Sequence, residues 1–304
     1  MKFALITDTG IVSSYICQNN KVYLLESGEP YYRLPHISNE CMMGFWNYPV
    51  LFDGYFINLR EGILPEEELD VIFASIEVDS RNLDIIKNAY PKAKIFGSIK
   101  ELEQQRNPVR QYVIDNTDAF IEPFLTYNFL SDLGYNLSNT NIIKILQPIN
   151  IEYLRSKYIT QKQNKLFNYE NHWHSGRGGH NHTFLNLIDN IEIIQQKPAP
   201  NDWQEFIQSW NECQYMLNLD PMCSVGQQAT QCAALGIIML GGLNDAHNIL
   251  FPEFATMDVN RLKQSFDKCR CDQSYSQDVV AYSQEMLKNH YSFEVVKKQI
   301  KELV

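Results

Sequence analysis

The chain has 304 residues, of which 44% are hydrophobic and 20% charged, a composition typical of a soluble globular protein long enough for two domains. Its formal net charge is -10, and acidic residues exceed basic ones in both halves, which argues against a general nucleic-acid-binding protein. Seven cysteines without a Cys-x-x-Cys pair indicate reduced thiols and a cytoplasmic location. No apolar run approaches the ~20 residues that a membrane-spanning helix needs, so we expect no membrane span.

Short apolar runs alternate with helix-like segments through the first half of the chain. The hydrophobic patterns predict strands at residues 3–6, 22–25, 70–76, 93–96, 119–121 and 142–146. They predict helices at 83–89, from 98 onwards and at 130–137. Strands that alternate with helices favour a mostly parallel sheet with helices on both faces.

The same alternation returns in the second half. Strands are predicted at 165–169, 191–194, 215–219 and 237–240. Helices are predicted at 184–188, 202–210, 227–235, 258–269 and 277–304, the last one broken near His290. The sequence therefore predicts an α/β protein of two domains joined near 148–158, with ligands in a cleft at the carboxyl ends of the strands.

The segment from His172 to His182 is the most distinctive part of the sequence. It holds three glycines, one arginine and four histidines between a predicted strand and a predicted helix. Backbone N–H groups at the start of a helix attract anions, and the guanidinium of Arg177 suits a phosphate group. We therefore expect this glycine-rich loop to hold a phosphate-bearing ligand.

Two other interpretations of this loop remain open. Glycine-rich turns are common without any ligand, so the loop can be purely structural. The four histidines, at 172, 174, 180 and 182, can also be zinc ligands, although their spacing matches no common zinc site. The phosphate interpretation is preferred because the glycines and Arg177 are sufficient for it.

Several segments resemble the GT-B glycosyltransferases, a family with two Rossmann-like domains facing across a cleft. Residues 1–10 resemble the first strand and its glycine turn, and 118–121 with 145–154 resemble the end of the acceptor domain and the linker. Residues 175–179 resemble the phosphate loop, 221–237 the nucleotide-sugar motif, and 281–285 the closing helix. The resemblance implies an acceptor domain at 1–150, a donor domain at 151–280, and a helix at 281–304 that packs back on the first domain.

The resemblance also implies an activity. The protein would move a sugar from a nucleotide-sugar, most simply a UDP-sugar, to an acceptor hydroxyl, as a hexosyl- or pentosyltransferase without a catalytic metal or other cofactor. The donor-binding residues that it implies are Gly10, Ser175, Gly176, Arg177, Gly178, Gly179, Cys223, Ser224, Val225, Gly226, Gln227 and Gln231.

One motif departs from the family pattern. Many retaining members carry Glu-x7-Glu where this chain has Cys223 and Gln231. The Gln231 amide can still bind a ribose hydroxyl because it both donates and accepts hydrogen bonds, whereas Cys223 is a poor replacement for a carboxylate. The pattern is nearest to the retaining group, but the stereochemical outcome stays open.

The expected chemistry assigns two catalytic roles. Arg177 would stabilise the negative charge that develops on the leaving diphosphate. An inverting enzyme also needs a general base for the acceptor hydroxyl, and Asp8 is the first candidate, with His36 and Asp79 as others.

The acceptor and the activity itself are the least determined features. A saccharide acceptor is the default expectation. Two alternatives are transfer to hydroxymethylated bases in viral DNA, which would require base flipping and a local positive groove, and a non-catalytic module that binds a phosphorylated ligand.

Overall fold

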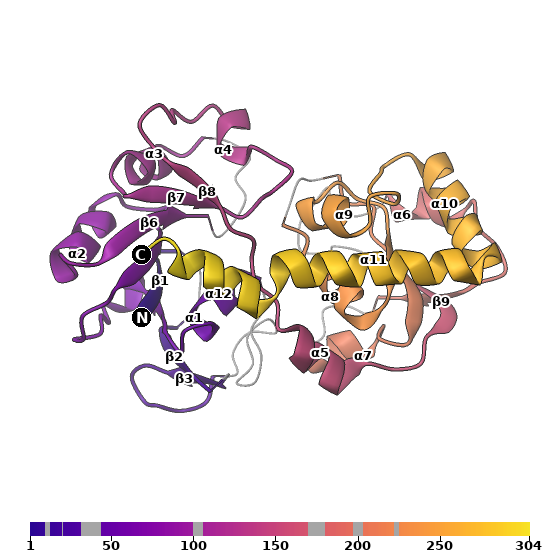
Figure 1. Ribbon diagram of the computed structural model, residues 1–304, viewed down its shortest axis with the longest axis horizontal. Helices are drawn as coiled ribbons and strands as arrows, with labels where there is room; N and C mark the ends of the chain where they lie inside the picture. The colour runs from indigo at the N-terminus through magenta and orange to yellow at the C-terminus, as the bar shows by residue number, and fades with distance from the viewer. Residues whose placement is uncertain are drawn as a thin grey trace. The chain divides into compact units, whose positions relative to one another are not determined.

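The computed structural model describes residues 1–9, 13–19, 21–31, 44–99, 106–169, 180–196, 203–221 and 225–304. These residues form two compact units, labelled by element in Figure 1. The first unit combines Met1–Pro148 with Phe293–Val304, and the second is Ile149–Ser292. Each unit is built on its own sheet, so the α/β class predicted from the alternation of strands and helices is confirmed.

The first unit contains an eight-stranded sheet with the order β3-β2-β4-β1-β5-β6-β7-β8. Its strands are β1 Phe3–Thr7, β2 Tyr15–Gln18, β3 Lys21–Leu24, β4 Tyr55–Asn58, β5 Val71–Ser75, β6 Lys94–Ser98, β7 Ala119–Glu122 and β8 Ile142–Lys144. From β4 to β8 the neighbours pair in parallel, whereas β2 pairs antiparallel with both β3 and β4. Sequence patterns missed β2 and β4, because four-residue strands carry too little periodicity to be recognised alone.

Helices cover both faces of this sheet. They are η1 Gly44–Trp46, α1 Asn47–Val50, η2 Leu59–Glu61, α2 Arg81–Ala89, α3 Pro108–Asp115, α4 Phe129–Asp132 and α12 Phe293–Lys301. The helix predicted at 130–137 is wrong beyond its first turn, because Gly134 adopts a left-handed conformation (φ +77°) that ends it. The helix predicted from 98 onwards falls largely on residues 100–105, outside the described residues, and Ser98 itself belongs to β6.

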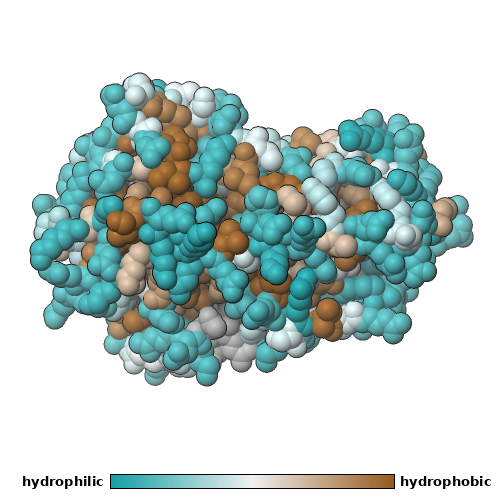
Figure 2. Space-filling view, viewed as in Figure 1, coloured by the Kyte–Doolittle hydropathy of each residue, from teal (hydrophilic) through white to brown (hydrophobic). Residues whose placement is uncertain are grey.

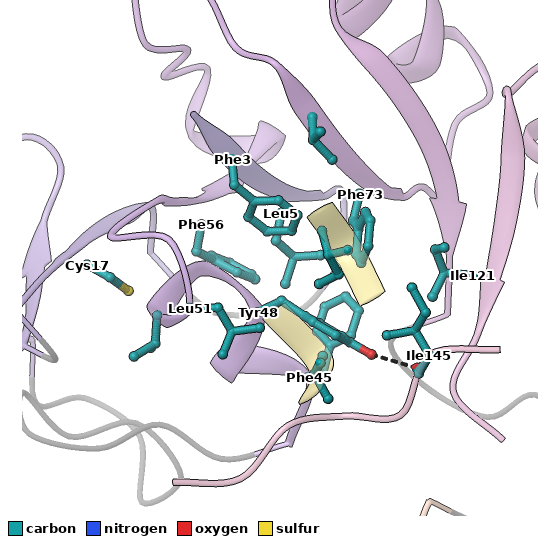
Figure 3. Close-up of a cluster of buried hydrophobic side chains, with 14 of the residues drawn as sticks. Phe3, Leu5, Cys17, Phe45, Tyr48, Leu51, Phe56, Phe73, Ile121 and Ile145 are labelled. Carbon is teal, nitrogen blue, oxygen red and sulfur yellow. Dashed lines mark hydrogen bonds between the residues drawn. The ribbon is translucent and has the colours of Figure 1, made fainter. Parts of the chain in front are cut away.

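The core of the first unit lies between the sheet and the pair α1 and α12. Phe3, Leu5 and Phe73 from the central strands pack against Tyr48 of α1, and Figure 3 shows these side chains converging. The Tyr48 hydroxyl donates to the carbonyl oxygen of Ile145 at 3.0 Å. Val296 and Ile300 bring α12 into the same core, so this last helix, yellow in Figure 1, is an integral layer of the first unit.

The second unit contains a fully parallel sheet with the order β10-β9-β11-β12. Its strands are β9 Gln163–Asn168, β10 Glu192–Gln195, β11 Cys213–Leu217 and β12 Ile238–Leu240. Its helices are α5 Ile151–Tyr158, α6 Asn181–Leu185, α7 Trp203–Gln208, α8 Gln227–Leu235, α9 Asp245–Leu250, α10 Val259–Cys271 and α11 Gln273–Tyr291.

Two sequence predictions for the second unit need comment. The segment predicted as a linker at 148–158 is mostly helix α5, which Asn150 caps by accepting a hydrogen bond from the Tyr153 N–H at 3.0 Å. The break predicted near His290 is confirmed as the junction between α11 and α12. α11 lies in the second unit and only α12 belongs to the first.

The surface seen in Figure 2 is mostly hydrophilic, with hydrophobic residues interspersed among polar ones. Across the described parts of the chain, no helix has both the length and the apolar character needed to cross a membrane.

Candidate functional site

The starts of helices α8 and α9 meet at the carboxyl end of the second sheet. Gly226, the residue before α8, has φ +77°, and a Cβ built on it would lie 2.1 Å from Asn244 Oδ1. Asn244 is the N-cap of α9, where its Oδ1 accepts from the His247 N–H at 2.7 Å. Only glycine can occupy position 226, because any side chain would push the two helix starts apart.

A glycine pair follows β12 at the same edge. Gly241 and Gly242 have φ values of +81° and +93°. A Cβ at Gly241 would lie 2.4 Å from Leu219 Cδ2, and one at Gly242 would lie 2.9 Å from the Asn218 carbonyl oxygen. The turn after β12 therefore rests directly on the chain that leaves β11. The sequence pattern predicts only that a strand ends at residue 240, although two glycines after a buried parallel strand are themselves a signal for close backbone approach.

Helix α8 begins without a negative charge of its own. Within the described residues, no side chain caps its first N–H groups, and its first turn contains no acidic residue. The backbone donors and the positive end of the helix dipole are thus available to an anion. α9 differs, because Asp245 lies in its first turn.

The predicted donor-binding residues divide into two groups. Val225, Gly226 and Gln227 lie at the start of α8, as the sequence predicts, and Gln231 lies one turn further along with 1% of its surface exposed. The remaining predicted residues fall outside the described residues. These are Gly10, Ser175, Gly176, Arg177, Gly178, Gly179, Cys223 and Ser224.

A buried histidine lies beneath the glycine turn. His247 of α9 is fully buried, and its Nε2 lies 3.0 Å from the Met239 carbonyl oxygen, to which it donates. A Cβ at Gly242 would lie 3.3 Å from His247 Nδ1. Burial lowers the pKa of His247 to about 4, so the imidazole is neutral at physiological pH. Sequence reasoning did not single out this residue.

In the first unit, the chain's own carboxylates lie buried at the carboxyl ends of the strands. Asp8 follows β1 and is 2% exposed. Its oxygens accept from the N–H groups of residues 77, 78 and 79 at 2.8, 3.1 and 3.1 Å, and from Asn82 Nδ2 at 2.9 Å. These backbone groups precede helix α2. The arrangement favours an anchoring role for Asp8 over the general-base role that its position suggested.

The other predicted bases gain no support from geometry. Hydrogen bonds from Arg81 lower the pKa of Asp79, and the Arg81 Nε donates to Asp79 Oδ2 at 2.9 Å. A lowered pKa makes Asp79 a weaker base. His36 falls outside the described residues.

A second buried carboxylate lies at the end of β7, and no sequence pattern pointed to it. Glu122 is 2% exposed, and its Oε1 accepts from the Leu130 N–H at 2.9 Å at the start of α4. Burial raises its pKa, because this effect outweighs the opposing effects of the Leu130 N–H and of Lys144, whose Nζ lies 4.0 Å from Oε2.

The histidines of the glycine-rich loop are only partly described. His180 and His182 are exposed at the start of α6, whereas His172 and His174 fall outside the described residues. The described parts of the chain contain no group of three or more His, Cys, Asp or Glu residues placed to hold a metal ion.

Comparison with solved structures identifies the fold. One similar structure is an alpha-glucosyltransferase in complex with UDP-glucose and DNA containing an abasic site. It shares 10% sequence identity, and 82% of this chain matches 85% of that one with a TM-score of 0.58. An alpha-glucosyltransferase in complex with UDP and DNA containing a HMU base also shares 10% identity. Sucrose-phosphate synthase from Thermosynechococcus elongatus matches 83% of this chain and 82% of its own (TM-score 0.59, 11% identity). HepE of Anabaena, solved with UDP and glucose, matches 77% of each chain (TM-score 0.52, 10% identity).

These similarities show that the chain has the GT-B fold, which confirms the resemblance drawn from the sequence. No protein-family model and no curated protein sequence matches the chain.

Proposed function

We propose that the protein is a glycosyltransferase that moves a sugar from a UDP-sugar to an acceptor hydroxyl. One observation carries this proposal: α8 begins at Gly226 with its N–H groups uncapped by described side chains, at the carboxyl end of a parallel sheet. Ligands of open α/β sheets bind at that end. The similar structures were solved with UDP-glucose or UDP, and both of these ligands carry a diphosphate that suits such a helix start.

The proposed chemistry requires fixed positive potential at the leaving diphosphate. The N–H groups at the start of α8 would stabilise part of the negative charge that develops there, and Arg177 with its neighbouring glycines would stabilise the rest. The Gly241–Gly242 turn would let a sugar or phosphate approach the backbone closely. We propose that no metal ion takes part, since Arg177 and the helix start can supply the charge.

Titration with UDP tests the donor site. We expect calorimetry to detect UDP binding to the wild-type protein and a large loss of affinity in Arg177→Ala. Arg261→Ala is a matched control, because Arg261 is exposed on α10 of the same unit. Equal affinity in Arg177→Ala and the control would show that the glycine-rich loop is structural.

Turnover tests the enzyme class. We expect release of UDP and transfer or slow hydrolysis of sugar from at least one member of a panel of UDP-hexoses and UDP-pentoses. Binding of UDP without turnover of any donor, whatever acceptor is supplied, would overturn the enzyme proposal in favour of a non-catalytic module.

We propose a saccharide as the acceptor, bound by the first unit. A second candidate acceptor is a hydroxymethylated base in DNA, because the similar alpha-glucosyltransferase was solved with DNA containing a HMU base. Label transfer to a hydroxymethylated duplex separates the two, and transfer to DNA should fall steeply with salt because phosphate contacts are electrostatic. Transfer to saccharides alone would exclude the DNA acceptor.

A further inference from the structure

We propose that Asn181 is a positioning residue for the donor site: it clamps the chains that leave β9 and β11 to each other. The inference rests on the proposed function and goes beyond it, because Asn181 contributes no group to the site that the family resemblance implies. Asn181 is the first residue of α6 and is 4% exposed. Its side chain is directed inward, to the carboxyl end of the sheet.

The hydrogen bonds of Asn181 join two separate strands. Its Nδ2 donates to Asn168 Oδ1 and to the Tyr169 carbonyl oxygen, each at 2.7 Å. Its Oδ1 accepts from the Leu219 N–H at 2.8 Å. Both N–H groups of the amide and its oxygen are therefore engaged, and one short side chain bridges the ends of β9 and β11.

The clamp lies just beyond the point where the strand ladder ends. β9 and β11 pair in parallel up to the register of Asn168 with Leu217, and the Tyr169 N–H then donates to the Leu217 carbonyl oxygen at 3.0 Å. The strands diverge after this bond. Asn181 extends the cross-link by holding the Tyr169 carbonyl and the Leu219 N–H, which no longer face each other across the ladder.

The clamp is connected to the start of α8 through one further contact. Gln228, in the first turn of α8, donates from Nε2 to the Tyr169 hydroxyl at 3.1 Å. Asn181 fixes the backbone of Tyr169, and Tyr169 holds Gln228. The helix start that would receive the diphosphate is thus tied to Asn181 by two consecutive hydrogen bonds.

Asparagine is the side chain that this geometry requires. The position needs two donors and one acceptor on a short stem, a combination that aspartate and serine lack. Aspartate would place a carboxylate against the Asn168 and Tyr169 oxygens. We therefore expect Asn181→Asp to disturb the site at least as much as Asn181→Ala.

UDP binding measured beside stability tests the proposal, with Asn211→Ala as the matched control. Asn211 is also buried in the second unit, and its Nδ2 donates to the Tyr158 carbonyl oxygen at 3.2 Å, but it precedes β11 and so lies at the opposite, amino end of the sheet. We expect UDP to bind roughly tenfold more weakly to Asn181→Ala, in line with the loss of buried hydrogen bonds. Asn211→Ala should lower the unfolding midpoint and leave UDP affinity unchanged.

Steady-state kinetics provides the second readout. A positioning role predicts a raised KM for the UDP-sugar with a much smaller change in kcat. Equal UDP affinity in wild type, Asn181→Ala and Asn211→Ala would overturn the positioning role alone. Failure of the wild type to bind UDP would instead overturn the proposed function, and this role with it. If Asn181→Ala does not fold, Asn168→Ala removes one clamp partner, and an unchanged affinity in that variant would equally overturn the role.

Discussion

Helices α2 and α8 both follow parallel strands at their carboxyl ends, yet the backbone N–H groups at or just before their starts have different partners. Before α2, the Asp8 carboxylate accepts from three successive backbone N–H groups, and Asp84 adds a negative charge in the first turn. Before α8, Gly226 offers no side chain, and the first turn contains no acidic residue. The first unit has thus supplied its own anion just before α2, whereas the described residues of the second unit supply none at the start of α8.

The different partners of these N–H groups indicate where a phosphate can bind. Buried backbone donors must have acceptors, so donors already satisfied within the chain have little affinity left for a ligand. Donors that lack an internal acceptor take one from solvent or from an anion. This contrast supports our proposal that the donor diphosphate binds at the start of α8 and not at α2.

Gly226→Ala is the strongest way to break the α8 start. The new Cβ would lie 2.1 Å from Asn244 Oδ1 and displace that side chain, and alanine is also strained at φ +77°. We therefore expect the unfolding free energy to fall by about 3 kcal/mol. UDP affinity should fall by more than about tenfold. Chemical denaturation and calorimetry measure the two effects.

Gly236→Ala is the control at the other end of the same helix. Gly236 has φ +73°, but its Cβ would meet only side-chain atoms at ordinary contact distances, Gln284 Nε2 at 3.4 Å and Val280 Cγ1 at 3.6 Å. We therefore expect about 1–2 kcal/mol of destabilisation and unchanged UDP binding. Equal loss of UDP binding in both glycine variants would mean that α8 is not a specific anion site.

The buried His247 should make the second unit sensitive to acid. Burial lowers the pKa of His247 from 6.5 to about 4. The stability that its neutral form contributes to the folded state is therefore fully present above pH 6.5 and is lost as the pH falls through 4. Between pH 6.5 and 4, the unfolded chain binds a proton at this residue and the folded protein does not. This difference lowers the unfolding free energy by roughly 3 kcal/mol. Unfolding free energy measured from pH 7 to 4 should therefore fall less steeply in His247→Gln.

Replacement of an exposed histidine provides the comparison for His247. His182→Gln, on the surface of α6, removes a histidine from the same unit without touching the buried imidazole. Parallel curves for wild type and His247→Gln would contradict the buried neutral imidazole.

Asp8→Asn tests whether the edge of the first unit is structural or catalytic. The amide loses the charge that holds three N–H groups, so we expect about 2 kcal/mol of destabilisation, with UDP affinity unchanged and turnover largely kept. Asp79→Asn, which weakens a solvent-exposed pair with Arg81, should change stability much less than Asp8→Asn. A stable Asp8→Asn protein without turnover would restore Asp8 as the general base.

Glu122→Gln should produce the smallest effect. Burial raises the pKa of Glu122, so its ionised form opposes folding: the wild type is more stable where the carboxyl is protonated and loses stability as the pH rises above 4.5. The glutamine Oε1 can still accept from the Leu130 N–H. We expect Glu122→Gln to gain slightly on the wild type between pH 4.5 and 8. The opposite trend would show that attraction to Lys144 outweighs burial.

The sequence alone determined features whose information is local. α8 was predicted at 227–235 and spans Gln227–Leu235, because apolar periodicity lies between Gly226 and Gly236. β5 and β11 were predicted because buried parallel strands are short apolar runs followed by polar or proline residues. The resemblance to the GT-B fold followed from the order of such elements.

The groups that meet at the ends of the strands could be identified only from the folded chain. Asp8 reaches N–H groups about seventy residues away, and Asn181 reaches Leu219 across two strands. A carboxylate after a strand reads the same in sequence whether it anchors a loop or takes a proton, and an asparagine beginning a helix reads as an ordinary residue of that helix. The sequence therefore determined where the two sheets lie along the chain. Burial and hydrogen-bond partners depend on residues distant in sequence, so they could be assigned only from the folded structure.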